Sequence, residues 1–174
     1  RILKKDLVLG TNSKVTVNNN STLNFGFDTS GTNPLAIRRF NNNATQTGQS
    51  FELKNGGILK ITSPDGITSG GTYTGNVQVG SSNSNRIFGG GATYHYIGKT
   101  NQSTGNGLPD GITGKLIIEL ETDDSNENLE FTSTGTNTFG TVGGVNGILE
   151  IRKGRVIDQP NNGFRNYNGT TNEN

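Results

Sequence analysis

Pairs of apolar residues recur every eight residues near the start of the chain. Each pair has the form apolar-x-apolar, and polar tetrads such as Gly10 to Ser13 and Asn18 to Ser21 separate them. An apolar-x-apolar run points two side chains to one face of a short strand, and a tetrad rich in Asn and Ser readily turns the chain. The spacing therefore predicts short strands joined by tight corners. The pairs are Leu7 with Leu9, Val15 with Val17, and Leu23 with Phe25.

Three such strands can form one turn of a triangular coil, and stacked turns form a right-handed parallel β-helix (β-solenoid). An antiparallel β-sandwich can use the same apolar pattern and is the alternative. Hairpins favour two-residue Asn-Gly or Asp-Gly turns, and such turns do not separate these three strands. We therefore predict an all-β parallel solenoid with loop excursions.

The composition supports a narrow core. Hydrophobic residues make up 28% of the 174 residues, which is low for a compact two-layer domain. The net charge of +1 and the many β-branched residues are nevertheless not typical of a disordered chain. The 27 glycines supply turns and disfavour helices. The absence of cysteine excludes disulfides and thiolate metal sites.

The period breaks over residues 28 to 50, which contain Pro34 and the Asn41 to Asn43 run, and it returns at Phe51, Leu59 and Ile67. We interpret 28 to 50 as a loop excursion within one solenoid domain, residues 1 to 160. Residues 161 to 174 are polar and are predicted to be a tail or linker. Because the chain opens on Arg1 without a signal sequence, we expect it to be part of a longer chain.

One internal echo accompanies this period. Residues Gly57 to Ile61 read Gly-Ile-Leu-Lys-Ile, and residues Gly147 to Ile151 read Gly-Ile-Leu-Glu-Ile. In both copies another isoleucine follows six residues later. Repetition of this kind is typical of modular arrays in which similar units stack.

The segment between the two copies holds the residues that are least expected from composition. Its pattern is Tyr-x-Tyr-x-Gly at Tyr94 to Gly98, followed by a polar run and a strand. The segment resembles repeat modules of large secreted and cell-surface proteins of Bacteroidetes (Flavobacterium type). The resemblance implies an adhesin-like protein exported to the cell surface and a β-solenoid, and it brings no catalytic residue with it. The polar run that carries it is Asn101, Gln102, Thr104, Gly105, Asn106, Gly107, Leu108 and Pro109.

Two roles are open for the tyrosines of this segment. Tyr94 and Tyr96 could form an exposed aromatic platform for a sugar ring. Alternatively, both rings fill the core and their hydroxyls reach its edge. We favour this second interpretation. His95 lies between them and faces the other side of the strand, so we expect it to have a structural role.

Two clusters of polar and charged residues are candidates for a calcium site and for a catalytic site. Asp124, Asn126 and Asn128 have the spacing that begins an EF-hand loop, but the later ligand positions of that loop fail, so a calcium site is only an alternative to an exposed acidic loop. A cleaving enzyme on a β-helix gathers acidic and basic groups on one outer face. The candidates for such a face are Arg152, Lys153, Arg155, Glu150 and Asp158.

These patterns favour a non-catalytic, extracellular structural or adhesive module of a surface protein. The alternative is a domain on the same scaffold that binds carbohydrate or cleaves polysaccharide. The expected partners are neighbouring modules or other chains that meet it end to end, and surface glycans are a further possibility. The near balance of 15 basic and 14 acidic residues argues against nucleic acid, and no apolar run suits membrane insertion. We expect no cofactor, with calcium as the exception named above.

Two local expectations follow from a solenoid. The corners at Asn18 to Asn20 and Asn41 to Asn43 should include residues with positive φ, which asparagine tolerates. The ends should lack caps, because neither the Arg1 to Lys5 segment nor the tail carries much apolar material. Uncapped ends invite association with other strands.

Overall fold

A computed structural model describes residues 3–31, 33–39, 48–68, 75–79, 85–109, 111–120, 128–131, 138–139, 147–157 and 165–166. These residues form sixteen strands and no helix, so the predicted all-β class is confirmed for this part of the chain. The strands are β1 (Leu7–Leu9), β2 (Lys14–Val17), β3 (Thr22–Asn24), β4 (Ile37–Arg39), β5 (Ser50–Leu53), β6 (Ile58–Ile61), β7 (Arg86–Phe88), β8 (Thr93–Tyr96), β9 (Gln102–Ser103), β10 (Gly111–Ile112), β11 (Lys115–Glu119), β12 (Asn128–Glu130), β13 (Thr138–Phe139), β14 (Ile148–Lys153), β15 (Arg155–Ile157) and β16 (Arg165–Asn166).

Every pair of named strands in the described part of the chain runs parallel. Outside the named strands, Phe27 and Pro34 form an isolated antiparallel bridge. The alternative of an antiparallel β-sandwich is therefore wrong for these residues. Parallel strands cannot be joined by tight hairpins, which explains why the corner sequences lack hairpin turns.

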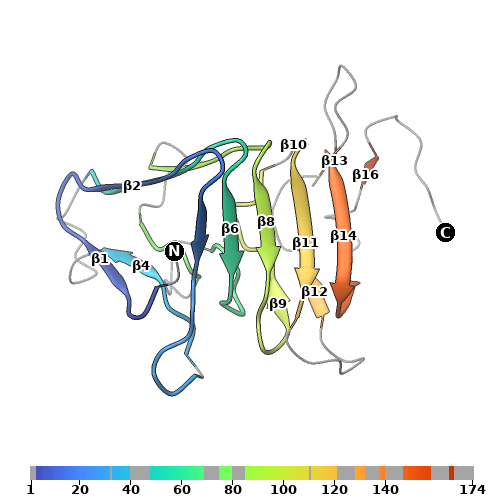
Figure 1. Cartoon of the computed structure of the whole chain (residues 1–174), viewed down its shortest axis with the longest axis horizontal. Coiled ribbons are helices and arrows are strands. Elements are labelled where there is room, and N and C mark those ends of the chain that lie inside the picture. The colour runs from blue at the N-terminus through green and yellow to red at the C-terminus, as the bar shows by residue number, and fades with distance from the viewer. Residues whose placement is uncertain are drawn as a thin grey trace.

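Consecutive strands fall in different sheets. β1 pairs with β4, β2 with β5, and β3 with β6, so the three strands predicted from the eight-residue period lie in three sheets, as expected. The largest sheet has the order β14-β11-β8-β6-β3. Figure 1 shows its strands side by side in chain order along the long axis of the molecule.

The register of this sheet aligns side chains into ladders. The first ladder is Leu23, Leu59, Tyr94, Leu116 and Leu149. The second ladder is Ile61, Tyr96, Ile118 and Ile151. Tyr94, Tyr96 and the aliphatic members from Leu59 to Ile118 are fully buried. A parallel sheet with one face closed by such ladders gains its stability from apolar burial.

The first strand departs from the predicted pattern. Leu9 is buried as expected, but Leu7 is 36% exposed. β1 lies at the edge of a two-stranded sheet, so only one side chain of the Leu7 and Leu9 pair is covered. The apolar spacing identified the strand correctly and overestimated its burial.

Side-chain hydrogen bonds hold the polar run after β8 in place. The Tyr96 hydroxyl donates to the Thr104 carbonyl at 2.9 Å. The Gln102 Nε2 donates to the Ser63 carbonyl at 2.8 Å, while its Oε1 accepts from the Gly98 amide at 2.7 Å. Each buried polar group thereby gains a partner, which burial requires. The segment that carries the family resemblance is thus structural in this fold.

Asn76 joins three separate segments. Its Oδ1 accepts from the amides of Thr62 and Ser63, both at 2.9 Å, and its Nδ2 donates to the Leu35 carbonyl at 2.7 Å. The side chain is fully buried. An amide that bridges segments far apart in sequence cannot be recognised from spacing, and the sequence analysis did not single it out.

Two asparagines at corners have positive φ. Asn20 has φ of 59°, which confirms the prediction for Asn18 to Asn20, and Asn12 has φ of 58°. Asn12 lies in the first polar tetrad, where we had not predicted it. Asn41 to Asn43 lie outside the described residues.

Two strands lie within ranges that the sequence analysis interprets as a loop excursion and a tail. β4 lies within the range 28 to 50 that we interpreted as a loop excursion, yet it pairs with β1 in register. β16 lies within the predicted tail 161 to 174 and pairs with β13. Both strands have little apolar alternation of their own, so backbone pairing with a neighbour defines them.

Candidate functional site

The outer face of the five-stranded sheet carries a charged cluster centred on His95. Alternation along β8 turns Tyr94 and Tyr96 inward and His95 outward. The His95 Nε2 lies 2.9 Å from Glu119 Oε2, at the end of the neighbouring strand β11. The His95 side chain is only 5% exposed.

Glu119 connects His95 to a second ion pair. The Arg152 guanidinium donates to Glu119 Oε2 at 2.9 Å and to Glu150 Oε1 at 2.7 Å. Lys115 Nζ lies 3.5 Å from Glu150 Oε2. The hydrogen bond from Arg152 is the main reason that the pKa values of Glu119 and Glu150 are below the ordinary value, and Arg152 has a raised pKa for the same reason.

The surroundings of His95 favour its neutral form over its charged form. Burial is the largest cause that lowers the pKa of His95 below 6.5, and Lys60 lowers it further. Glu119 acts in the opposite direction through its hydrogen bond and its charge. Burial prevails because removing an imidazolium from water costs more than one partly exposed carboxylate returns.

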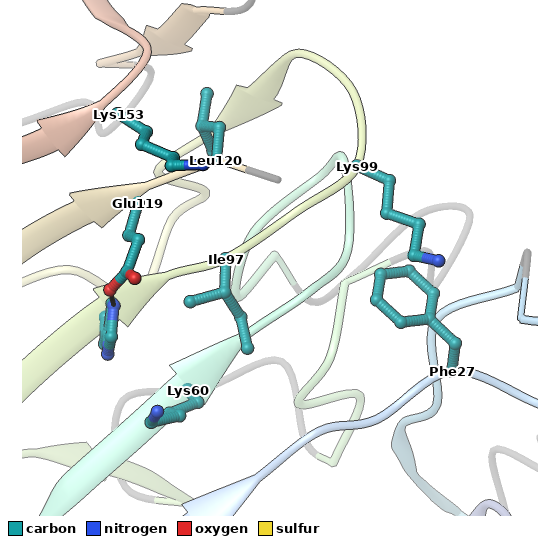
Figure 2. A pocket seen from close by; sticks show the side chains of 8 residues that line it. Phe27, Lys60, Ile97, Lys99, Glu119, Leu120 and Lys153 are labelled. Atoms are coloured by element: carbon teal, nitrogen blue, oxygen red, sulfur yellow. Dashed lines mark hydrogen bonds and ion pairs between the residues drawn. The ribbon is translucent and has the colours of Figure 1, made fainter. Parts of the chain in front are cut away.

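An open groove of about 520 Å³ lies beside this cluster. Figure 2 shows Lys60, Ile97 and Glu119 along one wall, with Lys99 and Phe27 across from them. Lys99 Nζ lies 4.8 Å from the centre of the Phe27 ring, within the range of a cation–π contact. The described residues that line it are Phe27, Lys60, His95, Ile97, Lys99, Glu119, Leu120 and Lys153.

The chemistry of the groove suits an anionic ligand better than a neutral one. Among the described residues, three lysines and one carboxylate, Glu119, line it, and that carboxylate already contacts Arg152 and His95. Apolar surface from Phe27, Ile97 and Leu120 adjoins the lysines. Such a surface can contact the ring of an acidic sugar while a lysine contacts its charge.

The structure places Tyr94 and Tyr96 in the core and corrects the alternative of an exposed glycan platform. Both side chains are 0% exposed, and burial raises the pKa of both phenols. The Tyr94 hydroxyl donates to the Gly89 carbonyl at 2.9 Å. A stacking platform needs a ring face in solvent, and neither ring offers one.

The calcium candidates are only partly visible. Asp124 and Asn126 lie outside the described residues. Asn128 is the first residue of β12, and its backbone amide donates to Asn101 Oδ1 at 3.0 Å. Within the described ranges, no three acidic or histidine side chains cluster so as to hold a metal ion.

The basic and acidic candidates for a cleaving enzyme are partly brought together. Glu150 and Arg152 form an ion pair on β14, and Lys153 lines the groove. Arg155 belongs to β15, in a different sheet, and Asp158 lies outside the described residues. The cluster therefore forms around Glu119 instead, which contacts both Arg152 and His95.

Sequence reasoning also missed Lys60, Lys99 and Phe27 as neighbours of His95. The register of β6 against β8 brings Lys60 beside His95, and this register is not encoded by any local motif. The one available signal was alternation, which correctly assigned His95 to the outer face.

Comparisons with protein-family models, with curated proteins and with solved structures gave no match. In the part of the chain that the structure describes, no helix has the length and apolar character needed to cross a membrane.

Proposed function

We propose that the chain is a right-handed parallel β-solenoid that acts as a non-catalytic structural or adhesive module of a long bacterial surface protein. The order of strands supports the winding: β10, β11 and β12 each pair with the strand three further on, namely β13, β14 and β15. Connections between parallel strands of one sheet are almost always right-handed. The resemblance of the Tyr94 segment supports the extracellular, cell-surface setting.

One observation carries the functional proposal: the two ends of the five-stranded sheet differ. At the β3 end, the Leu3 amide donates to the Asn24 carbonyl at 3.0 Å, its side chain packs against the core, and Leu23 is buried. The uncapped N-terminus that we expected is thus covered in part. At the β14 end, the ladder residues Leu149 and Ile151 are 37% and 51% exposed.

An open apolar edge strand is a site of strand addition. Neighbouring modules or other chains would meet this end, as expected of a unit whose neighbours bury its terminal surface. The function is then to join units into a long structure. This structure would present its outer faces at a distance from the cell. No reacting group is needed for this role.

Sedimentation of the 174-residue chain over a wide concentration range tests the proposal. We expect self-association that weakens in Ile151→Asp. The matched control Ile87→Asp replaces another half-exposed isoleucine, on β7, and should leave association unchanged. A chain that stays monomeric throughout, and whose β14 amides exchange as slowly as those of β11, would contradict an open end.

A carbohydrate-binding role is the second candidate, and the groove beside His95 favours it. The three lysines and the apolar surface of the groove would take a uronic-acid polysaccharide. Calorimetry with polygalacturonate should show binding that is lost in Lys60→Gln with Lys153→Gln, while neutral dextran should not bind. Cleavage has less support, because Glu119, the one carboxylate among the described lining residues, is held by Arg152 and His95.

A further inference from the structure

The repeated sequence Gly-Ile-Leu-x-Ile occupies two positions of the same sheet. One copy runs through β6 in the middle of the sheet, and the other runs through β14 at its edge. The two copies differ only in Lys60 and Glu150. The environment of the first copy therefore indicates what the second copy is built to contact.

In the first copy, β8 pairs with the edge of β6 that faces away from β3. Thr93, Tyr94, His95 and Tyr96 pair in register with Ile58 to Ile61. The Thr93 amide donates to the Gly57 carbonyl and the Ile97 amide donates to the Ile61 carbonyl, both at 2.8 Å.

The two tyrosines adjoin Leu59 and Ile61 in the ladders, and both of these residues are 0% exposed. This pairing combines a complete row of backbone hydrogen bonds with the burial of two aromatic rings, which are large apolar surfaces.

In the second copy, the corresponding surface is open. β14 has β11 on one side and is the last strand of the sheet among the described residues. Leu149 takes the place of Leu59, and Ile151 takes the place of Ile61, and both are exposed. The same apolar pair is thus buried beside a Tyr-x-Tyr strand at one position and exposed to solvent at the other.

We propose that the open edge of β14 binds a parallel strand of Thr-Tyr-x-Tyr type, in the register that β8 adopts on β6. This inference rests on the proposed end-to-end function and names the chemistry of the partner. The tyrosines of the incoming strand pack beside Leu149 and Ile151. Its amides bond the carbonyls of Gly147 and Ile151, as β8 does at Gly57 and Ile61.

The one difference between the copies specifies the middle residue of the incoming strand. His95 lies beside the cation of Lys60 on β6. On β14 the same position adjoins the carboxylate of Glu150. A histidine, lysine or arginine between the two tyrosines therefore gains a favourable charge contact at β14, although Glu150 also contacts Arg152 and Lys115.

A synthetic peptide with the sequence of residues 91–98, Gly-Ala-Thr-Tyr-His-Tyr-Ile-Gly, tests the inference in trans. Labelled peptide is titrated with the 174-residue chain and followed by fluorescence anisotropy. We expect saturable binding. The control peptide carries serine in place of both tyrosines and should bind at least about tenfold more weakly, a factor that corresponds to about 1.4 kcal/mol.

Protein variants locate the contact. Leu149→Asp and Ile151→Asp alter exposed side chains, should keep the wild-type circular dichroism, and should abolish peptide binding. Ile87→Asp should bind the peptide as the wild type does. Glu150→Lys should weaken binding of this peptide and should not weaken binding of one with glutamate in place of the histidine.

Equal binding of the tyrosine and serine peptides would overturn the inference, and so would peptide binding that survives Leu149→Asp. Sedimentation of the same variants separates the two proposals. Self-association that depends on Ile151 without peptide binding would leave the open end in place and reject the Tyr-x-Tyr partner. Loss of both signals in the wild type would reject both proposals.

Discussion

At the scale of single residues, His95 is the most informative group. Its folded pKa lies below 6.5 because of burial, so the unfolded chain binds more protons between that folded value and 6.5. This contribution to stability is full above pH 6.5 and falls as the pH is lowered. Glu119 acts in the same direction at lower pH, because its pKa is depressed in the folded state.

As the only histidine, His95 gives a single imidazole signal by NMR. We expect it to titrate below 6.5 in the folded protein. Lys60→Gln should raise the pKa of His95 by removing a neighbouring cation, and Glu119→Gln should lower it by removing the carboxylate. A wild-type value at or above 6.5 would show that the ring is more solvated than its position indicates.

Tyr96 tests the inner face of the same strand. Tyr96→Ala removes a fully buried ring and should lower the free energy of unfolding by about 3 to 5 kcal/mol. Tyr96→Phe keeps the ring and leaves the Thr104 carbonyl without its hydroxyl donor, so about 1 to 2 kcal/mol is expected. Urea unfolding measures both. Equal, small losses in the two variants would mean that the ring is not packed in the core.

At the scale of elements, the corners define where strands begin. Gly56 has φ of 75°, and a Cβ placed there would meet Asn19 Oδ1 at a clashing distance. Its amide and carbonyl bond Gly91 and Asn20, at 2.9 and 3.0 Å, so it links corners of neighbouring layers. Asparagine and glycine recur at these corners because both tolerate the left-handed region.

Gly56→Ala should therefore destabilise the protein by about 1 to 2 kcal/mol or more. Gly10→Ala is the matched control, because a Cβ at Gly10 meets no atom closer than 3.9 Å. It should leave the unfolding midpoint nearly unchanged. If the two variants unfold alike, the corner at Gly56 is not constrained as described.

Sequence patterns predicted the elements well where apolar alternation defines them. Val15, Leu23 and Leu59 were each assigned to strands that the structure contains. β4 escaped detection because its pairing with β1 depends on backbone contacts rather than on its own alternation. The site was predicted less well: His95 was placed on the correct face, but its neighbours depend on the register between β6, β8 and β11, which no local pattern specifies.

At the scale of the whole molecule, the position of a strand in its sheet decides whether its apolar side chains are buried. Leu59 and Leu149 lie in identical Gly-Ile-Leu contexts and occupy the same ladder. Sequence alone assigns them the same burial. Only the order of strands shows that Leu59 has a strand on both sides, whereas Leu149 has a described strand on one side alone.

This difference yields a paired prediction. Leu59→Ala removes a side chain that is 0% exposed and leaves a cavity between β3 and β8, so the free energy of unfolding should fall by about 2 to 5 kcal/mol. Leu149→Ala removes a side chain that is already 37% exposed and can relax into solvent, so a loss below about 1 kcal/mol is expected. Urea unfolding of the dilute chain measures both without interference from association.

At concentrations where the chain associates, the cost of Leu149→Ala should rise toward that of Leu59→Ala, because the incoming strand then buries the leucine. A cost for Leu149→Ala that is large in dilute solution and independent of concentration would show that the C-terminal end of the sheet is already covered within one chain.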